Sequence, residues 1–219
     1  MTHPYQLVCN VHMTTKQLDD STQTRDKILS AAYGEIHRSG FQAASIANIL
    51  ADTKLTKGAL YHHFPAKHAL GLAVIDEVIQ AGLEEMVFRP LREAEHPVDE
   101  LLDILQRKSE YLNEAAVKLG CPLNNLMQEM SPLDEEFKAR LMRILKAWQA
   151  AVRDALLQGQ RQRQIRANVD CEAAALFIVS AWEGCSGIAK NMQSIKTFRL
   201  CMAQLRGYVL GLKTAKKSK

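Results

Sequence analysis

The sequence predicts an all-α protein, and three observations carry this prediction. Strand signals are absent, since neither alternating β-branched runs nor Asn-Gly hairpin turns occur along the 219 residues. Apolar residues instead recur three and four positions apart, which is the spacing of one face of an α-helix. Capping residues, glycines and prolines separate these periodic stretches, so about nine helices are expected.

Two predicted helices come before the helix that carries most of the candidate functional residues. The earlier one carries an apolar stripe at Ile28, Ala32 and Ile36, and Gly40 suits the position just after its end. The later one begins at the N-cap Ser45 and ends at about residue 52. A connection of only three residues, 53–55, then leads to a third helix, so a tight turn joins the second and third helices.

The third predicted helix, from Lys57 to Phe64, has two contrasting sides. Thr56 can cap its start, and Pro65 ends it because the residue before a proline is pushed out of α geometry. At 100° per residue, Leu60 and Phe64 fall on one side. The other side is small, basic and aromatic, with Gly58 at a helical position that costs roughly 1 kcal/mol relative to Ala. Such a surface favours close approach of a phosphodiester backbone over an ordinary solvated face.

The stretch from Gly40 to Leu70, GFQAASIANILADTKLTKGALYHHFPAKHAL, combines these features at fixed spacings. In this it resembles the DNA-binding region of the TetR family of bacterial transcriptional regulators. The matching pieces are Gly40-Phe41, the cap at 45, the run from Thr56 to Phe64 and Lys67. Two residues depart from the family pattern: Leu50 replaces an alanine, and Lys54 replaces a turn glycine. A lysine at positive φ would be mildly strained, so the turn is expected to differ from that of relatives.

The resemblance and the helix geometry together assign contacts with DNA. The expected DNA-binding residues are Arg25, Ser45, Thr56, Lys57, Gly58, Ala59, Tyr61, His62, His63 and Lys67. Lysines 57 and 67 would neutralise phosphates, and Tyr61 and His63 would bond phosphate oxygens or pack on sugars. Base edges would be read by the residues at positions 56, 58, 59 and 62. Arg25 and Ser45 would add phosphate contacts at helix N-termini.

The rest of the chain is expected to be helical too. The predicted helices cover 66–88 with a break at Arg89-Pro90, 97–119 closed by Gly120, 122–130, a long helix opened by Ser131-Pro132 and running to 162, 168–191 and 194–213. The expected division is an N-terminal arm (1–21), the helix-turn-helix domain (22–68), a C-terminal domain (69–213) and a basic tail (214–219).

For the C-terminal domain, the resemblance implies an effector pocket and a homodimer paired through the last two helices. Ser180, Gly184 and Gly187 form a stripe of small residues, with Ala181 beside it, that would allow close helix approach. The alternative is tight packing of this stripe within one subunit.

Candidate effector-binding residues are mainly large and apolar: Tyr111, Cys121, Met127, Met130, Trp148, Phe177 and Trp182. Apolar residues at helical spacing are core more often than pocket, so both readings stay open. Cys121 sits between Gly120 and Pro122 at a helix junction, where it would sense electrophiles or oxidants, or would simply be a small buried side chain at a tight corner. A small hydrophobic or electrophilic effector is therefore expected.

Composition excludes several other classes. The net charge of +4 is modest, but residues 23–70 hold six basic against three acidic side chains. Neither a signal peptide nor a run of 18 apolar residues is found, so no membrane association is expected. Five cysteines without a C-x-x-C motif suit a reducing cytoplasm. His62, His63 and His68 lack the partners of a metal site, and no cofactor is expected.

The sequence therefore predicts a regulator, not an enzyme: a ligand-released repressor that binds a palindromic operator as a dimer. Two alternatives stay open. One is a helical adaptor whose degenerate helix-turn-helix binds protein, and the other is a small enzyme that depends on Cys121. Catalytic motifs such as G-x-S-x-G, a P-loop or H-E-x-x-H do not occur.

Overall fold

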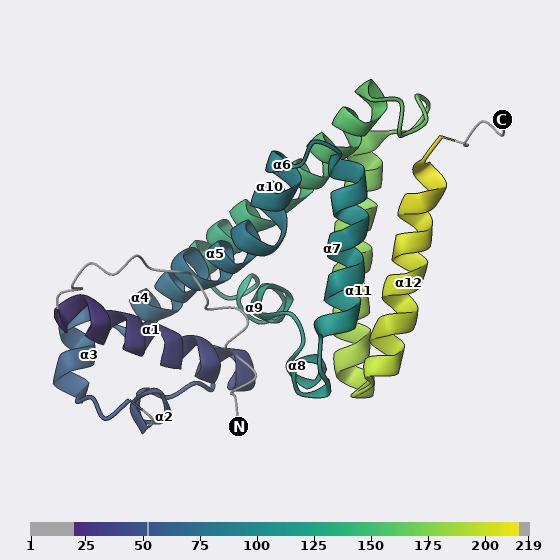
Figure 1. Ribbon diagram of the computed structural model, residues 1–219. Coiled ribbons are helices and arrows are strands. Elements are labelled where there is room, and N and C mark those ends of the chain that lie inside the picture. The colour runs from purple at the N-terminus through teal and green to yellow at the C-terminus, as the bar shows by residue number, and fades with distance from the viewer. Residues whose placement is uncertain (1–19, 52, 215–219) are drawn as a thin grey trace. The chain divides into compact units, whose positions relative to one another are not determined.

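The computed structural model describes residues 20–51 and 53–214, in which every regular element is helical (Figure 1). The all-α prediction is confirmed. By their contacts, the residues form two compact units: unit 1 is Met1–Gly82 with Pro122–Met142, and unit 2 is Leu83–Cys121 with Arg143–Lys219. Most of the predicted arm and tail lie outside the described residues. The domain boundary expected at residue 68 is a functional division and stays a prediction.

Unit 1 begins with the three predicted helices: α1 (Asp20–Ser39), α2 (Ile46–Ala51) and α3 (Lys57–His63). The predicted stripe of α1 is its inner face, since Ile28 and Ala32 are fully buried. Gly40 ends α1 with φ +83°, a left-handed conformation that glycine adopts without strain. The helix-turn-helix therefore forms as expected.

The next helix is continuous for longer than predicted. It comprises α4 (Lys67–Ala73), the π-helical segment η1 (Val74–Ile79), α5 (Gln80–Leu83), the π-helical segment η2 (Glu84–Phe88) and α6 (Arg89–Glu93). The break expected at Arg89-Pro90 is wrong. Pro90 follows a π turn in which the Arg89 N–H bonds the carbonyl of Glu84, five residues back. This wider turn explains how a proline is accommodated inside the helix.

The helix expected over 97–119 is two helices, α7 (Pro97–Tyr111) and α8 (Glu114–Leu119). Leu112 is extended, and the Asn113 side chain accepts a hydrogen bond from the Ala116 N–H at 2.8 Å. An asparagine cap inside the predicted helix thus starts a new one. Gly120 closes α8 at φ +74°, as predicted.

The helices α9 (Pro122–Met130) and α10 (Glu135–Arg161) follow, the latter long as predicted. The predicted cap at Ser131-Pro132 is wrong, because residues 131–133 form a turn. Asp134 is the cap instead, and its carboxylate accepts the N–H groups of Glu136 at 2.9 Å and Phe137 at 3.0 Å. These bonds lower the pKa of Asp134, the Phe137 N–H contributing most.

The last two helices are α11 (Cys171–Met192) and α12 (Ile195–Leu212), which pack side by side in unit 2 (Figure 1). A disulfide joins Cys185 of α11 to Cys201 of α12, whereas free thiols were expected. The sequence spacing of these cysteines gave no sign that they would meet. By length and mean hydropathy alone, α11 could cross a membrane, although it is not an uninterrupted run of 18 apolar residues. Half of its most apolar 18-residue stretch is buried inside the protein.

A pair of buried aromatic side chains packs within each unit. In unit 1, Phe41 and Phe137 pack with ring centroids 4.6 Å apart. In unit 2, Trp148 and Trp182 are almost fully buried and meet edge to face at 5.2 Å. These pairs pack residues from distant parts of the sequence against each other.

Candidate DNA-binding site

The helix α3 presents the predicted outer face to solvent. Leu60 is fully buried and Phe64 is 3% exposed, so these two residues fix the helix to unit 1. Lys57, Gly58 and His62 are exposed, and Tyr61 is 47% exposed. A side chain added at Gly58 would meet only the Thr56 hydroxyl, at 3.7 Å. The outer face is thus open enough for a second backbone to approach.

The turn before α3 has the strain that its sequence predicts. Lys54 adopts φ +58°, the left-handed conformation that favours glycine. The Thr53 hydroxyl supports this turn, since it donates to the Leu50 carbonyl at 3.0 Å and accepts the Leu55 N–H at 3.2 Å. Thr56 then caps α3 by accepting the Ala59 N–H at 3.1 Å.

Side-chain contacts within unit 1 already occupy some of the predicted DNA-binding residues. Both terminal nitrogens of Arg25 donate to Glu77 at 2.6 Å, and its guanidinium lies over the Phe64 ring. The Lys67 ammonium donates to the Gln42 carbonyl at 2.9 Å. A phosphate would have to compete with these contacts. The assignment of DNA contacts to Arg25 and Lys67 stays a prediction.

The other predicted residues lie at the surface of the same region. Ser45 caps α2, and its hydroxyl accepts the Asn48 N–H at 3.0 Å. His63 is half-buried, with its ring edge to face against that of His62 at 5.1 Å. Ala59 is half-buried between the exposed Gly58 and the buried Leu60.

Sequence reasoning missed Glu129, which supports this site from α9. Its carboxylate accepts the backbone N–H of Phe41 at 2.9 Å and of Gln42 at 2.8 Å. These N–H groups follow α1, where the chain turns toward α2. A single carboxylate 88 residues away in the sequence carries no local signal of this role.

The predicted effector residues are divided between the two compact units. Trp148 and Trp182 are in the core of unit 2, whereas Met127 and Met130 belong to α9 in unit 1. Tyr111 is 72% exposed at the end of α7. Their role in binding an effector stays a prediction.

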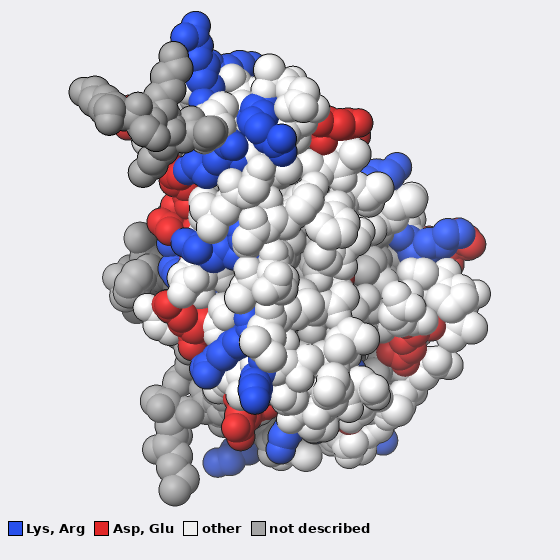
Figure 2. All heavy atoms as spheres, turned by 90° about the vertical axis from the view of Figure 1, so that its right-hand side faces the viewer, with Lys and Arg blue, Asp and Glu red and all other residues white. Residues whose placement is uncertain are grey.

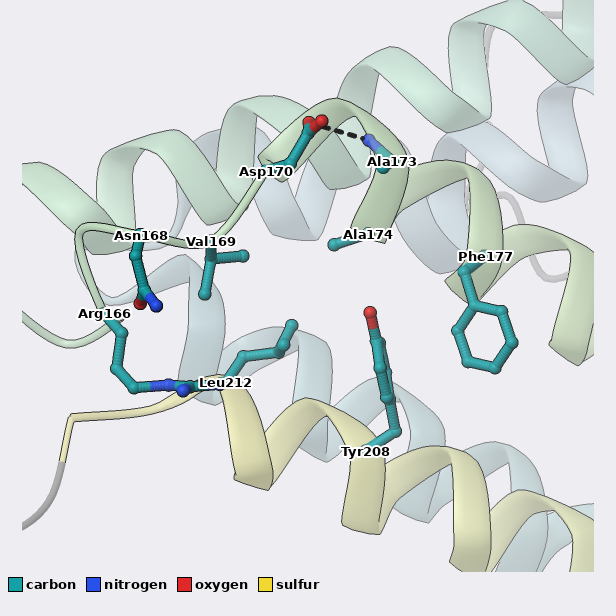
Figure 3. A pocket seen from close by; sticks show the side chains of 9 residues that line it. All are labelled: Arg166, Asn168, Val169, Asp170, Ala173, Ala174, Phe177, Tyr208 and Leu212. Atoms are coloured by element: carbon teal, nitrogen blue, oxygen red, sulfur yellow. Dashed lines mark hydrogen bonds between the residues drawn. The ribbon is translucent and has the colours of Figure 1, made fainter.

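One described pocket, of about 470 Å³, opens at the surface between the start of α11 and the end of α12. Figure 3 shows the Tyr208 hydroxyl pointing into it, while Asp170 turns away to cap α11 through the Ala173 N–H. Phe177 is the predicted effector residue that lines it, in ring contact with Tyr208 at 4.6 Å. The lining residues are Arg166, Asn168, Val169, Asp170, Ala173, Ala174, Phe177, Tyr208 and Leu212.

Cys121 lies in a cluster of ionisable side chains within unit 2 that we call the thiol cluster: Lys108, Cys121 and Glu183. The half-exposed thiol donates to a Glu183 carboxylate oxygen at 3.3 Å. Burial raises the pKa of Glu183 to about 7, opposed by the thiol hydrogen bond and by Lys108. Burial lowers the pKa of Lys108, opposed by Cys121 and Glu183. A glutamate in the middle of the apolar α11 sequence was the signal that could have revealed this cluster.

The small-residue stripe on α11 faces out of the subunit. Ser180 and Gly184 are exposed, Ala181 and Gly187 are half-buried, and a side chain added at Gly184 would meet nothing within 4 Å. Large apolar side chains surround the stripe on both helices: Leu176, Phe177, Ile188, Leu200 and Leu210. Figure 2 shows this side of the molecule, with a broad neutral surface and charged side chains mainly along its edges.

The helix pair α2–α3, with a capped second helix and an exposed basic and aromatic face, defines a helix-turn-helix regulator that binds DNA. Matches to known protein families agree with this class. Residues 28–74 match the family described as "Bacterial regulatory proteins, tetR family", and residues 97–205 match "Tetracyclin repressor-like, C-terminal domain". The chain belongs to the TetR family.

Individual relatives are consistent with this. An uncharacterized HTH-type regulator of Lactococcus lactis is 31% identical over 61% of this chain and 68% of its own length. The HTH-type transcriptional repressor DhaR of Mycobacterium sp. (strain GP1) is 25% identical over 66% of this chain and 71% of its own. A solved TetR regulator from Chloroflexus aurantiacus has a TM-score of 0.76 at 24% identity, covering 90% of this chain and 98% of that one, and shares its fold.

Proposed function

We propose that this regulator is a cytoplasmic repressor that binds a near-palindromic operator as a homodimer and leaves it when a small molecule binds. The exposed face of α3 carries this proposal, because Lys57, Tyr61 and His62 are turned outward while Leu60 is fully buried. A dimer would place two such helices about 34–36 Å apart, in successive major grooves. The name of the relative DhaR supports repression.

The dimer is supported by the outward face of α11 and α12. Exposed apolar side chains around an open glycine stripe allow two helix pairs to pack closely. A small-molecule effector would then act by binding better to a dimer whose α3 helices have the wrong separation. Regulation by binding is favoured over catalysis, because both family models that match the chain describe regulators.

The DNA assignment is tested by replacing Lys57 with alanine and measuring affinity for the upstream intergenic DNA over a range of salt concentrations. Loss of one phosphate contact per subunit should weaken binding and reduce the salt slope by about 0.9 per contact. Lys146→Ala is a matched control, since this exposed lysine belongs to unit 2. Equal slopes for the Lys57 variant and wild type would contradict the role given to α3, and binding to no upstream DNA would favour an adaptor that binds protein.

The dimer is tested with Gly184→Arg. No atom lies within 4 Å of the added Cβ, so the subunit should fold, while a partner packed on α11 would be displaced. Sedimentation should show monomers for this variant and dimers for wild type. Gly34→Arg, at an equally open glycine of α1, should stay dimeric. A dimeric Gly184→Arg protein would place the interface elsewhere.

A further inference from the structure

The thiol cluster brings together three chemically complementary groups from separate elements of unit 2. Lys108 comes from α7, Glu183 comes from α11, and Cys121 follows the close of α8. Gly120 forms the corner at φ +74°, which aims the next residue toward α11. The thiol donates to Glu183 at 3.3 Å, and Lys108 interacts electrostatically with both partners.

The thiol and the carboxylate of this cluster differ in their exposure to solvent. Cys121 is half-exposed, whereas Glu183 is 7% exposed behind it. A buried carboxylate that accepts a hydrogen bond from a thiol is positioned to take its proton, and a nearby ammonium stabilises the thiolate that forms. Cys171, the other described cysteine outside a disulfide, is buried and has a raised pKa because burial disfavours its thiolate.

The surroundings favour chemistry that needs one thiol. Cys171 precedes Glu183 by twelve residues on the same helix, which corresponds to about 18 Å along its axis. A disulfide requires Cα atoms within about 7 Å, so Cys171 is a poor partner for a thiol next to Glu183. Cys185 and Cys201 are already bonded to each other.

We propose that Cys121 is a covalent modification site for α,β-unsaturated carbonyl compounds, with Glu183 as proton acceptor and Lys108 as the electrostatic partner. The Glu183 carboxylate takes the thiol proton, and the thiolate sulfur bonds to the β-carbon of the ligand. The carbon–carbon π electrons move to the carbonyl oxygen as an enolate, which the Lys108 ammonium stabilises. Glu183 returns the proton to the α-carbon, so the S–H bond adds across the double bond without any oxidant or reductant.

The adduct has a direct route to the DNA-binding unit through the covalent chain. Cys121 is the last residue of this segment of unit 2, and Pro122 begins both α9 and the next segment of unit 1. Near the other end of α9, Glu129 holds the backbone N–H groups of Phe41 and Gln42. A bulky group at Cys121 would also break the hydrogen bond to Glu183. This part of the inference rests on the proposed function, and it identifies the effector as an electrophile.

The chemistry is tested with cyclohexenone on the full-length protein under non-reducing conditions, with peptide mapping by mass spectrometry. Cys121 should gain the whole mass of the reagent at least about tenfold faster than Cys171 in the same molecule, and Glu183→Gln should slow this reaction about tenfold or more. Lys108→Met should slow cyclohexenone more than iodoacetamide, whose displacement reaction forms no enolate. Cys171→Ser should leave the rate at Cys121 unchanged.

Equal rates at Cys121 and Cys171 in wild type would overturn the proposal, and this comparison needs no variant to fold. An unchanged rate in folded Glu183→Gln would overturn the role of the carboxylate. Operator binding separates the remaining outcomes: the adduct should weaken it about tenfold or more, and Cys121→Ser should abolish this response. If the unmodified protein binds no operator, the proposed function fails while the modification stands. If modified and unmodified proteins bind equally, the regulatory role of the site fails alone.

Discussion

The Glu129 carboxylate lies 2.9 Å from the backbone nitrogen of Phe41 and accepts its hydrogen bond. A second bond, from the Gln42 N–H, is 2.8 Å long. A side chain of α9 therefore holds the backbone of the segment that connects α1 to α2, directly before the helix-turn-helix. Two charge-assisted bonds to consecutive N–H groups make this a stronger contact than most neutral hydrogen bonds.

Glu129→Ala should destabilise the protein by about 1–3 kcal/mol, because two backbone N–H groups lose their acceptor. Urea unfolding followed by circular dichroism measures this change. Glu93→Ala, at the end of α6, is a control with the same loss of charge. Similar stability for both variants would mean that water replaces the carboxylate without cost.

Gly71→Ala should cost about 1–3 kcal/mol through overpacking. The added methyl group would overlap the Phe41 ring and lie 2.8 Å from the Phe137 ring. Gly34→Ala makes the same change at a helical site with no atom within 4 Å, and it should be neutral or stabilising. The Gly71 variant should therefore have the lower melting temperature of the two. A Gly71 variant as stable as the Gly34 variant would show that the rings can move apart.

Lys54→Gly should stabilise the protein by about 1 kcal/mol, since φ +58° is strained for a lysine and free of strain for glycine. The matched variant Lys54→Ala removes the same side chain but keeps the strain, so it should not gain stability. Denaturant midpoints measured side by side compare them. Equal midpoints would mean that the left-handed turn contributes no measurable strain.

Glu183 should make the protein less stable as the pH rises from 4.5 to about 7. Its pKa rises from 4.5 to about 7 on folding because burial disfavours the carboxylate. Below this window both states hold the proton. Within it, the unfolded chain loses the proton first, so unfolding is favoured by roughly 3 kcal/mol at the upper limit. Above pH 7 the effect is constant.

Glu183→Gln removes this titration, so the stability difference between the variant and wild type should grow from about pH 4.5 to about pH 7. The difference in stability between variant and wild type cancels the contributions of groups with the opposite trend. Asp134 is one such group, because its lowered pKa makes its contribution to stability disappear as the pH falls. Urea titrations at several pH values measure it. A difference independent of pH would show that Glu183 ionises at its ordinary pKa.

Local sequence signals predicted the helix-turn-helix well. The cap at Thr56, the buried pair Leu60 and Phe64, and the positive φ of Lys54 all depend on residues within a few positions of each other. Periodicity also placed α9 and α12 closely. Pro90 misled because a proline normally ends a helix, and only the preceding π turn accommodates it.

The missed features depend on distant parts of the sequence. Glu129 meets residues 41 and 42, Glu183 meets Cys121, and Cys185 is bonded to Cys201 through the pairing of two helices. No local pattern encodes these meetings, because they follow from how helices pack. The candidate effector residues belong to different units for the same reason: apolar spacing identifies a buried face without saying what covers it.

The chain crosses between its two compact units after Gly82, after Cys121 and after Met142. The DNA-binding region is therefore not a removable N-terminal cassette. A fragment ending at residue 82 would lack Glu129, and it would leave the Phe41 ring without Phe137. A chimera that transfers operator specificity to another regulator should carry residues 122–142 as a second insert. In this protein, the part that receives a signal and the part that reads DNA share a single interleaved chain, so neither can be exchanged by one cut.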